Sequence, residues 1–307
     1  MQNINESMTY ETVLSLFSEN YSKAFSFFSK LRESFDLSDP LPSFAGRISS
    51  AIGRAEEEID EAWRRIRASY QAVRAGYEII DQRSPFFPES LLESEYPVPF
   101  LYALGNLRLL EKERLTVIGS LGPSQEGARI AEDTASFINS NSLVLLTPLR
   151  LGVSSLAIAD TLRGSGSVIA FSSSFVTKAP NERLRDQMAD IYRRGGLILS
   201  ASGPALRENK WHQVIRNRAL SALSDSVFMI EEKDGGPAWK IFDAVSPSSK
   251  RMVSSHFIGR EGYTFISHHL ESGAMEYKSQ KDLKKLISKK ERRVRIKTDL
   301  SLTPDLF

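Results

Sequence analysis

The stretch that decides the fold class is Leu115-Thr116-Val117-Ile118-Gly119-Ser120-Leu121-Gly122-Pro123-Ser124. Its first four residues are apolar or β-branched and predict a short buried strand, and the glycines that follow predict a turn. Ser124 is a good N-cap for a helix that runs to Ser140, because its side-chain oxygen can accept a free N–H of the first turn. A strand, a tight turn and an amphipathic helix in this order are typical of an α/β protein. The inward positions of the helix are Ile130, Ala131, Thr134, Phe137 and Ile138.

The same alternation continues toward the C-terminus. We expect further strands at 143–146, 167–171, 197–199 and 227–230, with helices at about 154–162 and 181–193 and one more helix before the last strand. The strands are continuous apolar runs rather than alternating ones, which indicates a parallel sheet covered on both faces. The prediction is a Rossmann-like, doubly wound α/β fold with a mostly parallel sheet.

The first 75 residues follow a helical pattern instead. Apolar side chains recur at three- and four-residue steps from Tyr10 to Phe35, and a second helical region runs from about 44 to 76 after a proline break. We predict a small helical domain over 1–75 and an α/β domain over 76–287. The proline-punctuated segment 84–99 is expected to be a linker that docks on the α/β domain.

Composition is that of an ordinary globular protein, with 41% hydrophobic and 25% charged residues among 307. The chain contains no cysteine, which excludes disulfides, thiolate nucleophiles and zinc–thiolate sites and fits a reducing cytoplasm. No apolar run approaches the roughly 18 residues of a membrane span, and the N-terminus lacks a signal-peptide pattern. We expect a cytoplasmic protein that does not enter a membrane.

Charge is unevenly distributed, although its net value is only +2. Residues 1–75 carry 9 Lys/Arg against 11 Asp/Glu, whereas residues 278–307 carry 10 against 4. The end of the chain, 288–307, is thus a basic tail that either attracts a polyanion or is a solvated end. The alternation at 293–297 is compatible with a short edge strand and equally with disorder.

The segment Arg216-Asn217-Arg218 is the strongest candidate for a binding function. Arginine presents a planar fork of donors that suits phosphate, and a helix N-terminus offers free N–H groups and positive partial charge. We expect the segment to lie at the head of the helix that precedes the last strand. There it is either a phosphate-facing turn or an ordinary solvated first turn.

Common cofactor and catalytic motifs are missing from the sequence. The glycines of the 119–127 loop have neither the dinucleotide nor the Walker spacing, and the second strand ends in Thr147 rather than in an acidic residue. The four histidines show no zinc-ligand spacing and are expected in surface or loop positions. They are His212, His256, His268 and His269. We expect no cofactor, no metal and no catalytic residue, hence a binding protein rather than an enzyme.

In their order and spacing, several segments resemble the DNA-processing protein A (DprA/Smf) family over about 76–287. They are Phe86–Leu91, Pro99–Gly105, Val117–Ser120, Leu149–Val153, Gly195–Ser200 and Arg216–Ser224. The resemblance implies a non-enzymatic recombination mediator that binds single-stranded DNA and helps load a RecA-type recombinase during DNA uptake, in competence and transformation. It also implies a homodimer formed through the last part of the sheet. The family's optional C-terminal winged-helix domain is expected to be absent.

The resemblance further implies a phosphate-binding site, because in the family a loop arginine and the R-N-R segment line a basic DNA-binding pocket. Arg216 and Arg218 are expected to contact phosphates, and Asn217 is expected to orient the turn or a base. Backbone N–H groups near Gly119 and Ser120 are expected to contact another phosphate. The full expected set is Gly119, Ser120, Ser124, Arg150, Gly152, Arg216, Asn217 and Arg218.

Several positions around the implied pocket depart from the family pattern. Leu121 replaces the loop arginine, which removes one phosphate contact, and DNA affinity scales with the number of such contacts. Arg150, Arg207 and Lys210 are possible substitutes. The other altered positions are Thr147, Pro148, Ser154, Ile158 and Ala201. Two alternatives therefore stay open: a nucleotide-binding sensor or nucleotide-processing protein with a repurposed pocket, and a scaffold that retains only protein partners.

Overall fold

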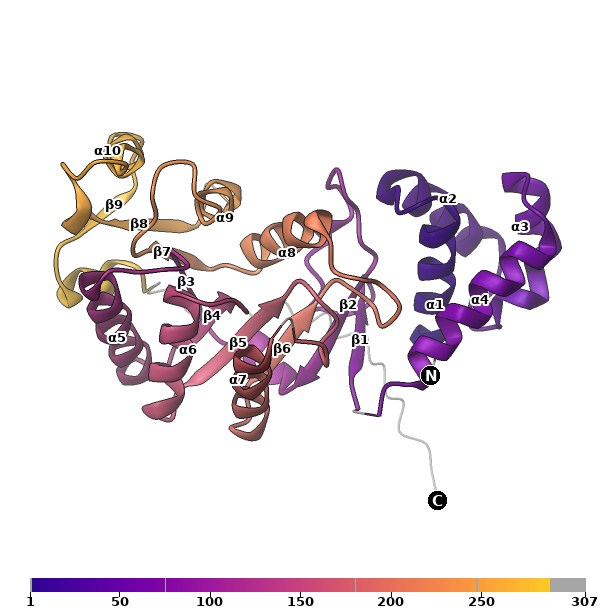
Figure 1. Cartoon of the computed structure of the whole chain (residues 1–307), viewed down its shortest axis with the longest axis horizontal. Helices are drawn as coiled ribbons and strands as arrows, with labels where there is room; N and C mark the ends of the chain where they lie inside the picture. Colours follow the sequence, from indigo (N-terminus) through magenta and orange to yellow (C-terminus); the bar gives the residue numbers. More distant parts are fainter. Residues whose placement is uncertain (1, 75, 180, 247, 288–307) are drawn as a thin grey trace, which may run out of the picture.

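The computed structural model describes residues 2–74, 76–179, 181–246 and 248–287. One nine-stranded sheet runs through the larger part of the chain, and the N-terminal helices lie together beyond one end of it (Figure 1). The predicted fold class, α/β with a mostly parallel sheet and an N-terminal helical region, is confirmed.

The sheet has the strand order β1-β2-β6-β5-β4-β3-β7-β8-β9. From β6 to β9 all neighbours are parallel, whereas β1 and β2 form an antiparallel edge beside β6. The order along the chain reverses between β3 and β7, and doubly wound folds bind their ligands at such a point. The strands are β1 Glu78–Asp81, β2 Phe100–Gly105, β3 Arg114–Ile118, β4 Val144–Pro148, β5 Ser167–Ser172, β6 Leu197–Ser200, β7 Ser226–Met229, β8 Lys250–Ser254 and β9 Met275–Tyr277.

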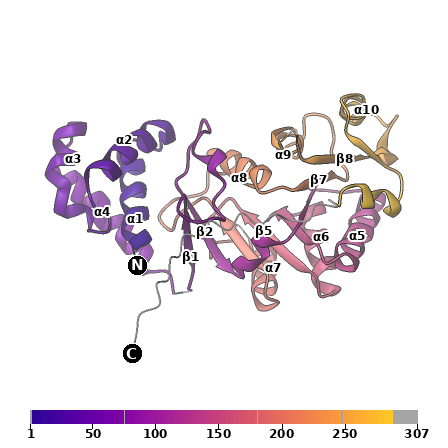
Figure 2. The ribbon, with the colours of Figure 1, turned by 180° about the vertical axis from the view of Figure 1, so that it is seen from behind.

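Helices cover both faces of this sheet, as a doubly wound fold requires. Helices α5, α6 and α7 lie on one face, and α8 and α9 lie on the opposite face, in both views (Figure 1, Figure 2). The helices that follow the strands are α5 Gln125–Ser140, α6 Val153–Arg163, α7 Glu182–Arg193, α8 Lys210–Ala222, α9 Trp239–Ala244 and α10 Thr264–Glu271.

Side-chain caps fix where the helices begin. Ser124 is the N-cap of α5, as predicted, and its Oγ accepts the N–H of Gly127 at 3.1 Å. Asn181 caps α7 in the same way and accepts the N–H of Leu184 at 3.0 Å. All five residues predicted to face inward from α5 are buried. These starts are local features, because the capping side chain replaces a backbone partner that the first turn lacks.

The sequence patterns miss the strands at the two ends of the sheet, which are β1, β2, β8 and β9. The prediction that 84–99 links two domains is wrong, because β1 precedes this segment, β2 follows it, and the two strands pair directly. Ile80 lies opposite Leu101 in that pair. The segment is therefore a connection within the sheet.

The N-terminal helices are α1 Gln2–Leu16, α2 Tyr21–Ser34, α3 Ala45–Ile52 and α4 Glu56–Gln71. They pack against the antiparallel edge of the sheet. The ring centroids of Tyr10 and Phe100 are 6.1 Å apart, and Tyr10 Oη donates to the carbonyl of Pro97 at 3.0 Å. Buried side chains of the helices and of the sheet form one continuous core. That residues 1–75 fold as a separate domain stays a prediction.

The basic tail at 288–307, the possible strand at 293–297 and the expected absence of a winged-helix domain concern a part of the chain outside the described residues. Within the described ranges, no helix is both long enough and apolar enough to cross a lipid bilayer.

Candidate functional site

A pocket of about 480 Å³ opens where strands β3, β4 and β5 end, beside helix α8. Its walls come from the loops that follow these strands, from α8 and from the start of α9. The predicted residues Arg150, Arg216 and Asn217 line it together with Leu121 and Lys210. The fold thus brings residues from distant parts of the sequence to the end of the sheet where ligands of doubly wound proteins bind.

Two arginines form the buried part of this pocket. The side chains of Arg150 and Arg216 are only 9% and 6% exposed. Burial lowers the pKa of Arg216 to about 10, and the nearby charge of Arg150 adds to this effect. Burial also lowers the pKa of Arg150, against a smaller opposing effect of Glu232. The guanidinium groups of Arg150 and Arg216 are therefore both desolvated, and they lie near enough for their positive charges to repel each other.

Neither arginine forms an ion pair within the described part of the chain. Arg216 donates from Nε and Nη2 to Asn217 Oδ1, at 3.1 and 2.8 Å. Arg150 Nη2 is buried and has no hydrogen-bond partner among the described residues. Glu208, which also lines the pocket, accepts hydrogen bonds from Ser173 and Ser174. Because a buried charge without a partner is costly, this arrangement favours the binding of an anion.

The prediction that Arg216 lies at the head of its helix is wrong. Helix α8 begins at Lys210, and Asn209 caps it by accepting the N–H groups of Trp211 and His212 at 2.9 and 3.2 Å. Arg216 lies in the middle of the helix, so the free N–H groups of the first turn are remote from it. The pocket uses the arginine side chain and not the helix terminus.

Arg218 lies away from the pocket, because residues two apart on a helix point in different directions. Its Nη2 donates to Glu95 Oε2 at 3.2 Å, and its guanidinium lies 5.4 Å from the ring centroid of Tyr96. Arg218 lines a different, serine-rich pocket near the C-terminal end of α8. Arg207 is exposed and does not line the pocket of Arg150 and Arg216, whereas Lys210 does.

Two of the predicted phosphate contacts of the 119–124 loop, Ser120 and Ser124, are already engaged within the protein. The N–H of Ser120 donates to the backbone carbonyl of Glu231 at 2.5 Å. The N–H and the hydroxyl of Ser124 donate to the Glu231 carboxylate at 2.9 and 3.0 Å. Glu231 thus occupies the place where a helix N-terminus would hold a phosphate. The N–H groups of Ser120 and Ser124 are therefore not free to donate to a phosphate.

Gly119 and Gly152 have a packing role. Gly152 has φ +84°, and a Cβ on it would lie 2.1 Å from the carbonyl oxygen of Ser120. A Cβ on Gly119 would lie 2.7 Å from Val153 Cγ2. The two glycines let the loop after β3 rest against the start of α6, and the side chain of Leu121 is left 57% exposed at the rim of the pocket.

Of the six positions that depart from the family pattern, Leu121 alone lines the pocket. Thr147 is buried in β4 and its hydroxyl donates to the carbonyl of Val117 at 2.7 Å. Ser154 and Ile158 are buried in α6. Pro148 ends β4, and Ala201 follows β6 and is half-buried. These five substitutions therefore change the packing around the sheet rather than the wall of the pocket.

Sequence reasoning missed Lys240, which lines the pocket from α9. The predicted series of elements ended at the strand before α9, so no pattern indicated this lysine. Trp211 and Glu208 were also missed, because the start of α8 was placed too late.

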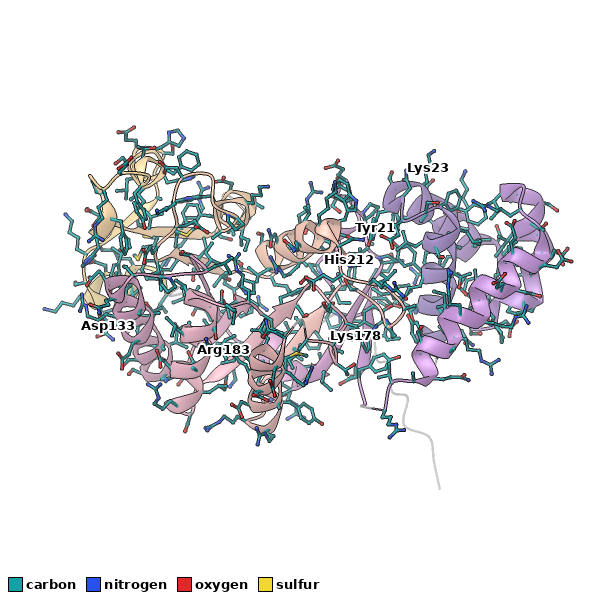
Figure 3. The ribbon with its side chains drawn as sticks, in the orientation of Figure 1. Tyr21, Lys23, Asp133, Lys178, Arg183 and His212 are labelled. Atoms are coloured by element: carbon teal, nitrogen blue, oxygen red, sulfur yellow. The ribbon has the colours of Figure 1, made fainter. Side chains whose placement is uncertain are left out.

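His212 was expected at the surface or in a loop, and this is wrong. It is buried in α8, against Tyr21 of α2, with their ring centroids 6.4 Å apart (Figure 3). Burial lowers the pKa of His212 to about 4, and neither ring nitrogen has a hydrogen-bond partner in the described part of the chain. His268 and His269 lie in α10, where His269 stacks on Trp239 with ring centroids 4.6 Å apart. Among the described residues, no cluster of three or more His, Asp or Glu side chains could hold a metal ion.

Comparison with known protein families gives one match that covers most of the chain. Residues 78–287 match the family described as DNA recombination-mediator protein A. The chain is 27% identical to the DNA processing protein DprA of Bacillus subtilis over 158 residues, which are 51% of this chain and 52% of that protein. The matched stretches span about half the length of the curated relatives.

Two solved structures share the fold. The X-ray structure of DprA from Streptococcus pneumoniae has a TM-score of 0.66 at 21% identity and covers 92% of this chain and 95% of that chain. DNA processing protein A from Helicobacter pylori, solved for its single-stranded DNA binding mode, has a TM-score of 0.58 at 19% identity. That likeness covers 68% of this chain and 94% of the other.

Proposed function

The chain belongs to the DNA recombination-mediator protein A family, and we propose that it binds single-stranded DNA through the pocket lined by Arg150 and Arg216. It acts by binding rather than by catalysis, as a mediator that helps a RecA-type recombinase onto the strand during DNA uptake. Support comes from the family match, from DprA relatives in two organisms and from the single-stranded DNA binding of the Helicobacter pylori protein.

The observation that carries this proposal is the buried pair Arg150 and Arg216. A phosphate diester supplies the negative charge that neither guanidinium group has as an ion-pair partner within the described chain, and it supplies an acceptor oxygen for Arg150 Nη2, which has none there. Binding an anion there compensates for the desolvation of two like charges. Lys210 and Lys240 add positive charge to the walls of the same pocket, so that neighbouring phosphates of a strand are also attracted.

The proposal is tested by fluorescence anisotropy with a labelled oligothymidine over a series of salt concentrations. We expect Arg216→Gln to raise Kd about tenfold, because a charge-assisted hydrogen bond is worth roughly 1.5–3 kcal/mol. The slope of log K against log salt falls by about 0.7 for each single-strand phosphate that the variant no longer neutralises. Arg218→Gln is the matched control, since it removes the same charge from the same helix outside the pocket.

Equal affinity and equal salt slope for the wild type and Arg216→Gln would refute the proposal.

Recombinase loading is tested separately, by the rate at which a RecA-type protein forms filaments on a strand coated with single-strand-binding protein. The proposed homodimer, through the β8–β9 end of the sheet, is tested by analytical ultracentrifugation of the full chain.

A second candidate is a protein that binds a free nucleotide in the same pocket. The pocket volume of about 480 Å³ lies in the usual range for small-molecule sites, roughly 300–1,000 Å³. Against it, Glu231 already fills the place at the start of α5 that would hold a nucleotide phosphate. A rise in melting temperature with mononucleotides, and none with oligonucleotides, would favour this second candidate.

A further inference from the structure

We propose that Glu19, in the turn between α1 and α2, is a positioning residue for the DNA-binding pocket. It holds Asn209, the N-cap of α8, and through this contact the N-terminal helices set the affinity of the pocket for single-stranded DNA. The inference rests on the proposed function, because it assumes that α8 carries side chains that contact DNA. It adds regulation of that site by a part of the chain that does not line it.

The contact between Glu19 and Asn209 joins the turn to the start of α8. Asn209 Nδ2 donates to Glu19 Oε2 at 2.6 Å, and Asn209 Oδ1 accepts the N–H groups of the first turn of α8. Both ends of the amide are therefore used, and Glu19 keeps the amide oxygen turned toward the helix. Because the cap supplies the acceptor that the first turn itself lacks, the residue that orients the cap also helps to fix where the helix begins.

The charge of Glu19 supplies what the first turn of α8 lacks. A helix N-terminus carries positive partial charge and is stabilised by acidic side chains in its first turn. Helix α8 has no acidic residue there, and it begins with the cation Lys210, which lines the pocket. A lysine at this position favours DNA binding but disfavours the helix. The Glu19 carboxylate offsets this effect from a distant part of the sequence.

The backbone of the turn is strained at the residue that makes this contact. Glu19 has φ +60° and Ser18 has φ +51°, in the left-handed region that glycine adopts more readily. The N–H of Glu19 donates to the carbonyl of Leu14 at 2.9 Å, so the turn is fixed by the helix before it. Strained backbone is concentrated at functional sites. Here a glycine would relieve the strain, but it would lack the side chain that reaches Asn209.

Two further contacts hold the start of α8 and the loop before it against the N-terminal helices. Glu11 Oε2 accepts the N–H of Ala205 at 3.2 Å, and a Cβ on Gly203 would lie 1.5 Å from Glu11 Oε1. The loop therefore fits closely around this carboxylate. Tyr21, the first residue of α2, packs on the buried ring of His212 in the first turn of α8 (Figure 3). Since close-packed segments transmit a displacement, a shift of the N-terminal helices changes the wall of the pocket.

The test exchanges the two polar groups and measures the Kd of the full chain for a labelled oligothymidine by fluorescence anisotropy. Asn209→Asp keeps a capping oxygen, but it loses the donor and places a second carboxylate against Glu19. We expect Kd to rise about fivefold or more, the usual size of a coupling between sites. The double variant Glu19→Gln/Asn209→Asp again pairs one amide with one carboxylate, at the net charge of the wild type. It should return Kd to within about twofold of the wild-type value.

A matched control and a second variant accompany this exchange. Asn20 is the N-cap of α2 and accepts the N–H of Lys23 at 3.0 Å. Asn20→Asp therefore adds the same charge at another helix cap, next to Glu19 in the sequence, and should leave Kd unchanged. Glu19→Gly removes the contact with little risk to the fold, because glycine adopts a positive φ readily. It should also raise Kd about fivefold.

The outcomes separate this inference from the function on which it rests. If Asn209→Asp and Glu19→Gly bind like the wild type while Arg216→Gln binds more weakly, the role of Glu19 is overturned and the phosphate site stands. Equal Kd values for Asn209→Asp and the double variant also overturn it, because the added charge, and not the lost contact, then weakens binding. If Arg216→Gln leaves Kd unchanged, the proposed function itself is overturned.

Discussion

Glu11 of helix α1 accepts a hydrogen bond from Tyr102 of strand β2, with 2.9 Å between Oε1 and Oη. The same carboxylate accepts from Tyr70 of α4 at 2.5 Å and from the N–H of Ala205 at 3.2 Å. One buried side chain therefore connects two N-terminal helices, the antiparallel edge of the sheet and the loop that leads into α8. The position of the N-terminal helices is coupled in this way to the element that carries Arg216.

Glu11 is expected to make the protein less stable as pH rises from about 4.5 to 7. Burial raises its pKa from 4.5 to about 7, against the opposing effect of its hydrogen bonds. The folded state then binds a proton that the unfolded state has released, so the free energy of unfolding falls across this range, by on the order of 3 kcal/mol. Glu11→Gln should remove this dependence, as measured by urea unfolding at several pH values. An unchanged pH profile in the variant would contradict the assignment.

His212 is expected to act in the opposite direction. Burial lowers its pKa from 6.5 to about 4, so between these values the unfolded state binds a proton that the folded state does not. Stability from this residue is complete above pH 6.5 and is lost as pH falls toward 4. His212→Phe should abolish the acid-side loss and leave the effect of Glu11 visible alone. The same urea series, run on both single variants and the double variant, separates the two contributions; a steeper acid loss in His212→Phe would show that the assignment is wrong.

Gly152→Ala is expected to destabilise the protein by about 2 kcal/mol or more, because an alanine there must adopt a positive φ and also displace a backbone carbonyl. The φ of +84° and the 2.1 Å approach to Ser120 O are the structural basis. Gly195→Ala is the control: Gly195 has φ +74° with no atom near its Cβ position, so strain alone should cost about 1 kcal/mol. Chemical denaturation of both variants checks this, and equal costs would argue against the close packing of the loop.

Replacing one of the buried arginines is expected to stabilise the free protein. Arg150→Met removes a charge that has no ion-pair partner in the described chain, and substitution of a buried ion by an apolar side chain stabilises by about 1–2 kcal/mol in favourable cases. The same variant should bind DNA more weakly, since sites built for binding are often not optimal for stability.

Sulfate provides the complementary measurement for this pair. It should raise the melting temperature of the wild type more than that of Arg150→Met, because a bound anion stabilises the folded state by linkage. The difference between the two proteins removes the general stabilising effect of sulfate. Equal gains would mean that the pocket holds no anion.

The fold was largely predictable because its signals are local. The strand at 115–118, the Ser124 cap and the inward face of α5 follow from a window of 26 residues, 115–140, and the structure agrees with each. The strands β1 and β2 were missed because their place in the sheet depends on the pairing of β2 with β6 and of β1 with β2, and no local pattern points to either pairing. The start of α8 was predicted too late because its N-cap, Asn209, lies in a polar stretch. No apolar periodicity in that stretch indicates that a helix begins there.

The residue types of the site, two arginines and an asparagine on a helix and another arginine after a strand, can be read from the chain without its fold. Which of them act together follows only from the packing of the folded chain. It buried Arg216 beside Arg150, pointed Arg218 toward Glu95, and set the Glu231 carboxylate against Ser124, where a phosphate contact had been expected. The physical reason is that backbone periodicity and capping are fixed by near neighbours, whereas the partner of a charged side chain is chosen by the packing of segments that are distant in the sequence.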